Sequence, residues 1–410
     1  MSNMAKKLKD YCTVISGYAF KSKDLSEGTD IPVIKIGNIS NGENIVIDNS
    51  TQYVSKELLA IDEKYHIKNG DILISLTGSH MNQPNSMVGR CCRSLDNTVY
   101  LLNQRAGKII PKKTIDKDFL YYVFRLQSIQ YAIANRAYGG ANQVNVSPKD
   151  VMGIKFNIPD ISVQKKIAKV FVAYDSLIEN NNKRIRLLEQ MAESLYKEWF
   201  VRFRFPGYED VEFENGVPKG WEWQMLVDVT KLLQRGISPI YDDAGIYTVI
   251  SQKCIRGKTM DISEAKKQIK DYKEMLNLQD EDTVICSTGT GTLGRVGKVI
   301  GEYPNTTFDS HVTLARAKNG IGKQFLYGSI KNLQPRFMNM GIGSTNQQEL
   351  YISLIRKTKI LMPTDDLQQK FEDIVKPLHD EIGLIIKKNK YLIRQRDMLL
   401  PRLMSGKLEV

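Results

Sequence analysis

The glycine-rich segment that begins at Gly289 has the residue types and the spacing of a cofactor site. It reads GTGTLG from Gly289 to Gly294, a G-x-G-x-x-G pattern, and it follows the run Thr283–Cys286, which is typical of a strand. Asp309 stands about 20 residues after the first glycine, where dinucleotide-binding proteins place the carboxylate that holds the ribose. Taken alone, these residues predict the binding of a nicotinamide or flavin dinucleotide.

The other reactive side chains form no catalytic pattern. The five cysteines include no C-x-x-C pair and the four histidines are scattered, so no metal-ligand spacing arises. Cys91 and Cys92 near His80 are a weak metal candidate, and buried, reduced thiols explain them more simply. Paired carboxylates such as Asp242-Asp243 are typical of turns. We therefore expect no metal, no cofactor and no catalytic residue.

The composition is that of a folded, basic protein with more than one domain. The chain has 410 residues, of which 42% are hydrophobic and 25% charged, which favours two or three domains. No apolar run approaches the roughly 18 residues of a membrane span, and there is no signal-peptide pattern, so we expect a cytoplasmic protein without membrane contact. The net charge of +12, from 58 Lys and Arg against 46 Asp and Glu, favours an anionic partner, above all nucleic acid.

The sequence contains an internal repeat. The segment IPDISVQKKIAKVF resembles MPTDDLQQKFEDIV, which pairs Pro159 with Pro363 and Gln164 with Gln368. Upstream, GDILISLTG resembles EDTVICSTG, FLYYVF resembles FLYGSI, and GGANQVNV resembles GSTNQQEL. Each half is therefore predicted to be a β-rich globular part followed by a long helix.

The repeat argues against a dinucleotide site. The first copy of the glycine segment, LTGSHMNQPNSMVG, has no G-x-G-x-x-G. In the second copy the residues after Gly294, RVGKVIGEYPNTTF, are β-branched and interrupted by glycine and proline, which predicts a strand or hairpin. A dinucleotide site needs a helix there, whose N-terminal N–H groups bind the pyrophosphate. We interpret the glycines as turn residues.

Two long helices are predicted from apolar residues that recur in steps of three and four. The first runs from about Ser162 to Arg202 and the second to about Leu399, so each would be about 60 Å long. Ser162 and Asp366 are the predicted N-caps. Because each helix needs a partner for its long apolar seam, we expect them to pack as an antiparallel coiled coil. Pro377 is an objection, since it should kink the second helix.

Two asparagines interrupt the apolar seams of these helices. We expect Asn181 and Asn389 to lie in a solvated patch of the helix surface. The alternative is a buried pair that fixes the register of the two helices.

Over essentially its whole length, the chain resembles a known family, the specificity subunits of Type I restriction-modification systems. The residues that carry the resemblance are the central helix continuing through AESLYKEWF, and VPKGWEWQML at the start of the second half. GGANQVNVSPKDVMGIKFNIP and the C-terminal LIRQRDMLLPRLMSGKLEV complete the set. The first half lacks the P-x-G-W opening and starts at KKLKDYCTVISGYAF.

The resemblance implies an α+β chain with two similar mixed α/β target-recognition domains, related by a pseudo-twofold repeat and separated by the two helices. The implied boundaries are 1–157 for the first domain, 158–205 for the central helix, 206–361 for the second domain and 362–410 for the C-terminal helix. Each domain would read one half of a bipartite, asymmetric site in double-stranded DNA. The helices would dock two methyltransferase subunits, and restriction or translocase subunits would join the complex, so this chain would be non-catalytic.

If the two halves read different sequences, base-reading residues should differ between the copies and shared residues should be scaffold. Shared residues such as Asn142, Gln143, Asn346 and Gln347 are therefore expected to be turn residues. Divergent polar residues in corresponding loops are the DNA-binding candidates, because amides suit adenine, arginine suits guanine, and basic residues also hold phosphates. They are Lys35, Asn38, His80, Asn82, Gln83, Asn85, Arg90, Arg93, Arg235, Gln252, Lys253, Arg256, Arg295 and Lys298.

The aromatic residues that follow the central helix are candidates for partner docking, with an ordinary hydrophobic core as the alternative. They are Trp199, Phe200, Phe203 and Phe205. Two other functions remain open for the whole chain. One is the target-recognition subunit of a Type IIB-like enzyme, and the other is a coiled-coil scaffold that does not bind DNA.

Overall fold

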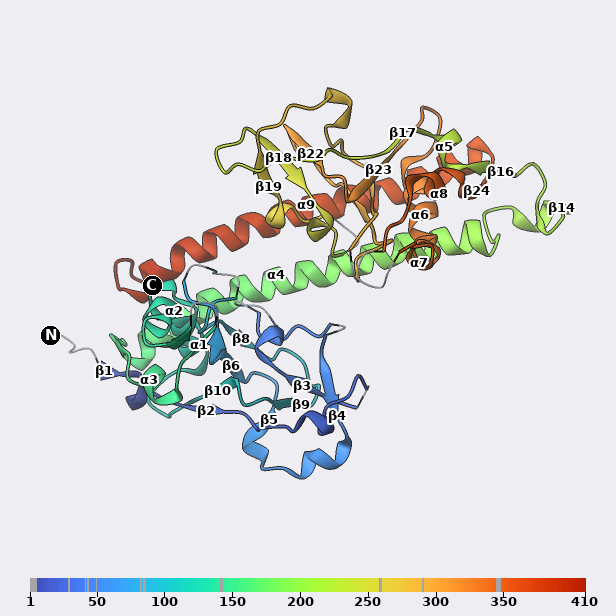
Figure 1. Ribbon diagram of the computed structural model, residues 1–410. Coiled ribbons are helices and arrows are strands. Elements are labelled where there is room, and N and C mark those ends of the chain that lie inside the picture. Colours follow the sequence, from blue (N-terminus) through green and yellow to red (C-terminus); the bar gives the residue numbers. More distant parts are fainter. Residues whose placement is uncertain are drawn as a thin grey trace. The chain divides into compact units, whose positions relative to one another are not determined.

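The computed structural model describes residues 6–28, 30–40, 42, 44–48, 50–81, 83, 86–140, 143–257, 260–289, 291–343 and 348–410. These residues form two compact units. Unit 1 contains the chain up to Glu179 together with Tyr391–Val410, and unit 2 contains Asn180–Lys390. The elements of each unit can be followed by colour and label in Figure 1.

The two units have the same main sheet. In unit 1 it has the order β2-β10-β6-β8, and in unit 2 the order β17-β23-β20-β21, with all neighbours antiparallel. The strands of unit 1 are β2 (Cys12–Ser16), β10 (Ala106–Pro111), β6 (Ile72–Ser75) and β8 (Cys91–Arg93). Those of unit 2 are β17 (Thr230–Arg235), β23 (Val312–Ala317), β20 (Thr283–Cys286) and β21 (Val296–Lys298). The internal repeat seen in the sequence is therefore a repeat of the fold.

A second sheet in each unit mixes parallel and antiparallel pairs, with one parallel pair in each unit, two antiparallel pairs in unit 1 and one in unit 2. Its order is β4-β3-β9-β5 in unit 1 and β19-β18-β22 in unit 2, where β3 is parallel to β9 and β18 to β22. The strands are β3 (Ile31–Ile34), β4 (Gln52–Val54), β5 (His66–Ile67), β9 (Tyr100–Leu102), β18 (Tyr247–Ile250), β19 (Lys266–Gln268) and β22 (Thr306–Phe308).

Smaller strand pairs complete the two units. The short sheet β11-β12-β7 of unit 1 has its counterpart in unit 2 as isolated bridges of Glu349 with Thr288 and Ile342. The pairs β1–β13 and β16–β24 close the start of each unit against its end, and β14–β15 is a hairpin of unit 2. The bounds are β1 (Lys6–Lys7), β7 (Thr77–Gly78), β11 (Tyr138–Gly140), β12 (Gln143–Asn145), β13 (Lys155–Phe156), β14 (Phe213–Glu214), β15 (Val217–Pro218), β16 (Glu222–Met225) and β24 (Lys359–Met362).

Three short helices follow one another in the same order in both units. They are α1 (Lys117–Arg125), α2 (Gln127–Ala134) and α3 (Pro148–Met152) in unit 1, and α6 (Lys323–Asn332), α7 (Gln334–Asn339) and α8 (Ile352–Lys357) in unit 2, which also has the short helix α5 (Leu226–Val229). Helix α1 begins where Asp116 accepts a hydrogen bond from the Phe119 amide at 2.9 Å. The apolar residues of α1 from Phe119 to Phe124 are all buried, so this helix forms the centre of the core of unit 1.

The two long helices are α4 (Ile161–Tyr196), which continues into a π-helical turn at Lys197–Val201, and α9 (Asp365–Met404). The predicted N-caps were each wrong by two positions. Helix α4 begins one residue before Ser162, and α9 begins one residue before Asp366, so both residues lie in the first turn. Pro377, which was expected to kink the second helix, does not interrupt α9, which is helical throughout its length.

Within each unit the α4 and α9 segments pack antiparallel. In unit 1 Arg396 donates to Asp175 at 2.7 Å, and in unit 2 Arg184 forms an ion pair with Glu381 at 2.9 Å. The expectation of a solvated asparagine patch was wrong. Asn181 and Asn389 are only 6% and 8% exposed, and the Asn181 amide donates to Asn389 Oδ1 at 2.7 Å. The buried pair is the correct alternative, because the apolar seam encloses both amides.

Residues shared between the copies hold the long helices to the N-terminal ends of α1 and α6, as expected for scaffold. Gln164 in α4 accepts from the Asp116 amide at 2.8 Å, and Gln368 in α9 accepts from the Gly322 amide at 3.2 Å. Both glutamines are buried, and each donates to the proline carbonyl that precedes its helix. The matched glutamines of the sequence repeat are therefore matched contacts in the structure.

Candidate nucleic-acid interface

One edge of each unit collects the loops that carry most of the predicted DNA-binding residues. In unit 1 the C-terminal ends of β2, β3, β6 and β9 and the N-terminal ends of β8 and β10 meet at this edge, as the strand registers require. We call it the loop edge of unit 1 and define it as residues 17–18, 35–38, 76–81, 83, 86–90 and 103–105. The loop edge of unit 2 follows from the same registers and consists of residues 236–237, 251–256, 287–289, 291–295 and 309–311.

A glycine in the same place closes both loop edges. A Cβ atom on Gly17 would lie 2.3 Å from the Leu102 carbonyl oxygen, and one on Gly236 would lie 1.9 Å from the Phe308 carbonyl oxygen. Only glycine permits this approach of the two backbones. The loops that follow β2 and β17 are therefore pinned to the ends of β9 and β22.

Two predicted cations of unit 1 lie together at its loop edge. Arg90 Nη2 donates to the Ile36 carbonyl at 3.1 Å, and Lys35 Nζ donates to Gln52 Oε1. Burial and the nearby charge of Arg105 lower the pKa of Lys35, and burial lowers the pKa of Arg90. A cation whose charged form is disfavoured by its surroundings gains from the approach of an anion such as phosphate.

Two other predicted residues of unit 1 have their polar groups engaged inside the protein. Asn38 is 5% exposed, and its amide donates to the Val46 carbonyl at 2.8 Å and to Thr51 Oγ1 at 3.0 Å. Arg93 lies on β8, forms ion pairs with Asp118 and Asp175, and has a side chain only 12% exposed. In this conformation both residues support the fold.

The loop that contains His80 and Gln83 is only partly described. Ser79 Oγ donates to the Gln83 carbonyl at 2.7 Å, His80 is half-buried and the Gln83 side chain is exposed. Asn82 and Asn85, which were predicted to bind DNA, lie outside the described residues, as do Asn142, Asn346 and Gln347. Gln143, predicted to be a turn residue, is an exposed residue of β12.

In unit 2 the structure brings Gln252 into a polar cluster at the loop edge. Thr288 Oγ1 lies 2.7 Å from His311 Nδ1 and donates to Gln252 Oε1 at 3.4 Å. Lys253 and Arg256 are exposed on the loop after β18, and Arg295 is half-buried before β21. Arg235 instead forms an ion pair with Glu349 and donates to the Leu350 carbonyl at 2.8 Å.

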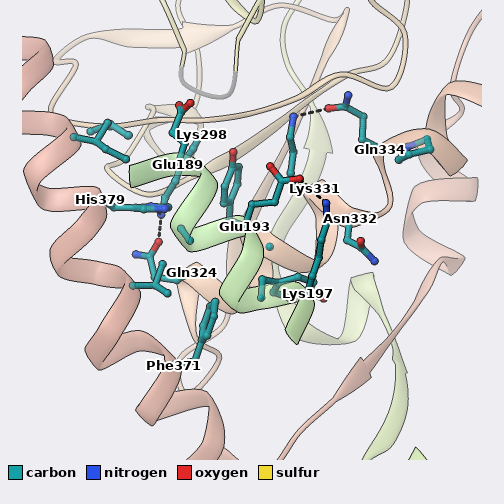
Figure 2. Close-up of a pocket in the computed structure, with 18 residues that line it drawn as sticks. Glu189, Glu193, Lys197, Lys298, Gln324, Lys331, Asn332, Gln334, Phe371 and His379 are labelled. Carbon is teal, nitrogen blue, oxygen red and sulfur yellow. Dashed lines mark hydrogen bonds and ion pairs between the residues drawn. The ribbon is translucent and has the colours of Figure 1, made fainter. Parts of the chain in front are cut away.

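Lys298, the last predicted candidate, is buried away from the loop edge. It is 1% exposed, and its Nζ atom donates to Gln324 Oε1 and His379 Nδ1. Burial lowers the pKa of Lys298 to about 7 and that of His379 to about 3. These residues line a cavity of about 230 Å³ in unit 2, with Lys298, Gln324 and His379 on one side and Glu193, Lys197 and Lys331 on the other (Figure 2).

The glycine segment of unit 2 forms a turn at the loop edge. Gly289, Gly291 and Gly294 all have positive φ angles, and the chain continues from Gly294 into the strand β21. Because a strand follows where a dinucleotide site needs a helix, the structure agrees with the interpretation of these glycines as turn residues. Asp309 is buried, and burial raises its pKa.

The aromatic residues after α4 belong to the core of unit 2. Trp199, Phe200 and Phe205 are buried, and Phe200 packs against Phe325 and Phe371 at ring-centroid distances of 4.9 Å. Phe203 is partly buried on the same core. Their burial favours the alternative of an ordinary hydrophobic core, and a role in partner docking stays a prediction.

Among the described residues there is no group of three or more His, Cys, Asp or Glu that could hold a metal ion. All five cysteines are buried thiols, and burial raises their pKa values. No helix in the described part of the chain is both long and apolar enough to span a bilayer.

The sequence analysis missed one position of the loop edge. The turns Asn103–Arg105 and Asp309–His311 connect β9 to β10 and β22 to β23, and they expose Arg105 in unit 1 and His311 in unit 2. These turns carry no motif or glycine signal. Only the strand registers show that Arg105 and His311 are equivalent.

Two units of one plan, each with a loop edge of different polar residues, are the features of a protein that recognises DNA at two places. The chain matches the family described as "Type I restriction modification DNA specificity domain" twice, over residues 2–190 and 218–393. It belongs to this family. The protein is thus a specificity subunit, the non-catalytic, DNA-recognising component of a Type I restriction-modification system.

Curated relatives and one solved structure agree with this assignment. The Type I restriction enzyme MjaIX specificity subunit of Methanocaldococcus jannaschii is 27% identical over 99% of this chain and 93% of that protein. The Type I restriction enzyme HindI specificity subunit of Haemophilus influenzae is 24% identical over 84% of this chain and 88% of that protein. The S subunit of a Type I system from M. genitalium has the same fold, with a TM-score of 0.54 at 16% identity, covering 98% of this chain and 97% of that one.

Proposed function

We propose that this chain reads a bipartite, asymmetric DNA site, with the loop edge of unit 1 on one half-site and that of unit 2 on the other. The observation that carries the proposal is the duplication. The same sheets and the same pinning glycines present different polar residues, such as Lys35 and Arg90 in unit 1 and Gln252 and Lys253 in unit 2. A common scaffold with different exposed residues suits two different sequences.

The predicted DNA-binding residues that the structure describes, which leaves out Asn82 and Asn85, divide into two groups by their surroundings. The stronger candidates lie at a loop edge with accessible polar groups: Lys35, His80, Gln83, Arg90, Gln252, Lys253, Arg256 and Arg295. Asn38, Arg93, Arg235 and Lys298 are proposed to act indirectly, because their polar groups bind other parts of the protein. The domain boundaries at 157, 205 and 361 remain a proposal, with the sheets of each unit as the recognition domains.

The exposed faces of α4 and α9 are proposed to dock two methyltransferase subunits, with restriction or translocase subunits joining the complex. Leu187 and Met191 lie one turn apart on α4 and are 60% and 57% exposed. Leu384, Tyr391 and Met398 recur every seventh residue along α9 and are at least half exposed. Exposed large apolar residues at such spacing favour a helical partner surface. A complex that modifies DNA in this way would act in the cytoplasm.

The proposed function is tested by sequencing the methylated bases of a host that carries this chain with its neighbouring methyltransferase subunit. Deletion of this chain alone should remove one bipartite motif with a modified adenine in each half. Unchanged methylation, with the methyltransferase subunit present and active, would contradict the proposal and favour the scaffold that does not bind DNA.

A further inference from the structure

The turns Asn103–Arg105 and Asp309–His311 have the same backbone contacts in the two units. The Leu76 amide donates to the Arg105 carbonyl at 3.0 Å, and the Ser287 amide donates to the His311 carbonyl at 2.8 Å. The Gly17 amide donates to the Ala106 carbonyl at 3.0 Å, and the Gly236 amide to the Val312 carbonyl at 3.2 Å. Arg105 and His311 therefore occupy one and the same position of the repeated fold.

The first residue of each turn is part of the scaffold. Asn103 is 8% exposed and accepts a hydrogen bond from the Arg105 amide at 3.3 Å. Asp309 is 2% exposed and accepts one from the His311 amide at 3.0 Å. A buried side-chain oxygen thus holds the turn in both units. The shape of the turn is retained, and the exposed side chain at its end is what differs.

The surroundings of the two exposed side chains suit contact with a nucleic acid. Arg105 is exposed, and it lies near enough to half-buried Lys35 that burial and then the charge of Arg105 lower the pKa of Lys35, so two cations lie close together at this edge. His311 has its Nδ1 atom fixed by Thr288 Oγ1 at 2.7 Å, which orients the ring and leaves Nε2 for an outside partner. A rigid backbone beneath an exposed arginine or histidine is the arrangement that base contacts require, because a loosely held side chain loses discrimination.

We infer that Arg105 and His311 are specificity-determining residues, each contacting a base pair of the half-site read by its own unit. This inference rests on the proposed function. Arg105 selects a guanine, whose O6 and N7 atoms accept two hydrogen bonds from one guanidinium group. His311 presents a single ring nitrogen and selects a different base in the other half-site. Divergence at this one matched position contributes to the asymmetry of the whole site.

The competing role for Arg105 is a phosphate contact, which stabilises binding to every sequence alike. The two roles separate when affinity is measured against a library in which each base of the recognised half-sites is varied. The complex to use is the full chain assembled with its methyltransferase subunits. The variants are Arg105→Gln, Arg105→Lys and His311→Ala. The control is Lys113→Gln, an exposed cation beyond the opposite end of β10.

Arg105→Gln should lower the preference for guanine at one position of the first half-site by about tenfold or more. Arg105→Lys should lose most of the same preference while retaining the charge, because lysine lacks the bidentate fork. His311→Ala should alter one position of the second half-site only, and Lys113→Gln should alter none. Thermal unfolding of each variant checks that the turn is intact.

The inference is overturned if Arg105→Gln weakens binding to all library members equally, or if neither Arg105→Gln nor His311→Ala changes any base preference. A wild-type complex without a bipartite preference would instead contradict the proposed function. The two failures are therefore distinguishable.

Discussion

A cation on the last strand of the main sheet reaches the long helix in both units, but its partners differ. In unit 1 Arg93 on β8 binds Asp118 of α1 and Asp175 of α4, and its guanidinium lies 4.0 Å from the centre of the Tyr121 ring. Burial disfavours its charge, but Tyr122, Tyr121 and the two aspartates raise the pKa of Arg93 overall. Asp175 also accepts from Arg396 of α9 at 2.7 Å.

In unit 2 Lys298 occupies the position of Arg93, since each pairs with the first residue of the neighbouring strand. Gln324 and His379 replace the two aspartates, and the ring of Tyr327 lies 5.3 Å from Lys298 Nζ. Burial lowers the pKa of Lys298. The nearby carboxylates Glu281, Glu372 and Asp280 raise it, but by a smaller amount.

Both units thus retain the contact between the sheet and the long helix, but the electrostatics of this contact differ between them. Both cations were predicted to bind DNA because they differ between the copies and stand near the recognition loops. Their difference is explained by matched changes in their partners, which is the pattern of a repacked contact. Divergence between repeats indicates recognition only where the divergent side chain is exposed.

The largest expected effect that separates the two contacts is that of Arg93→Met. The substitution removes the cation shared by Asp118, which is half-exposed, and Asp175, which keeps its bond from Arg396. Loss of these ion pairs and of the Tyr121 contact should cost unit 1 about 2–3 kcal/mol. Lys298→Met at pH 9 should change the stability of unit 2 by only about 1 kcal/mol, because the lysine is then largely neutral.

Hydrogen exchange of peptides from each unit, followed by mass spectrometry, measures the two effects separately. Faster exchange in α1 and the first half of α4 of the Arg93→Met protein is expected. Equal losses in Arg93→Met and Lys298→Met would show that the two contacts are energetically alike, contrary to the comparison.

The second effect is a pH dependence confined to unit 2. The unfolded lysine, with its ordinary pKa near 10.5, binds a proton more tightly than folded Lys298, with a pKa of about 7. The unfolded state therefore holds more protons between these values, and the stability of unit 2 should rise by about 2 kcal/mol from pH 7 to pH 9. His379, with its pKa lowered to about 3, adds a loss of stability as the pH falls below 6.5.

Tryptophan fluorescence isolates this effect, because Trp199, Trp221 and Trp223 all lie in unit 2. Urea unfolding should show the rise in the wild-type protein and in Lys370→Met, an exposed lysine control on α9. Lys298→Met should remove most of it. A rise of the same size in Lys298→Met would assign the dependence to other groups.

The fold could be predicted from the sequence because the two copies support one another. Gln164 and Gln368 were matched in the sequence repeat and make matched hydrogen bonds in the structure, and the β-branched run after Gly294 was correctly predicted to form a strand. The positions of single side chains could be predicted less well from the sequence. Whether Lys298 points to solvent or under a helix depends on which face of β21 is covered, and a three-residue strand has too few alternating residues to decide this.

The residues of the candidate site could be predicted only in part, for a related reason. Loops such as the one after β6 could be predicted because they are long and differ between the copies. Arg105 lies in a short turn between two strands, and the sequence of this turn gives no signal of a recognition loop. Its equivalence with His311 depends on hydrogen bonds between strands far apart in the sequence. Sequence comparison of the two halves lacks this information, since the strands between the matched segments have diverged.

The smallest expected effect concerns the contact between the long helices. The partly buried contact in unit 1 is the charged pair Arg396–Asp175. Unit 2 has the more exposed ion pair Arg184–Glu381 and, buried beside it, the neutral pair Asn181–Asn389, in which Asn389 also donates to Asn182 at 2.8 Å. Asn181→Leu leaves the Asn389 carbonyl oxygen buried without its donor, at a cost of about 1–2 kcal/mol to unit 2. The double change of Asn181 and Asn389 to Leu removes both polar groups and should recover most of that stability. Urea unfolding followed by tryptophan fluorescence measures the stability of the wild-type protein, the single variant and the double variant. A double variant that is less stable than the single variant would mean that the two amides do more than satisfy each other's hydrogen bonds. In that case the pair would fix the register of α4 against α9, as a polar residue does at a coiled-coil seam.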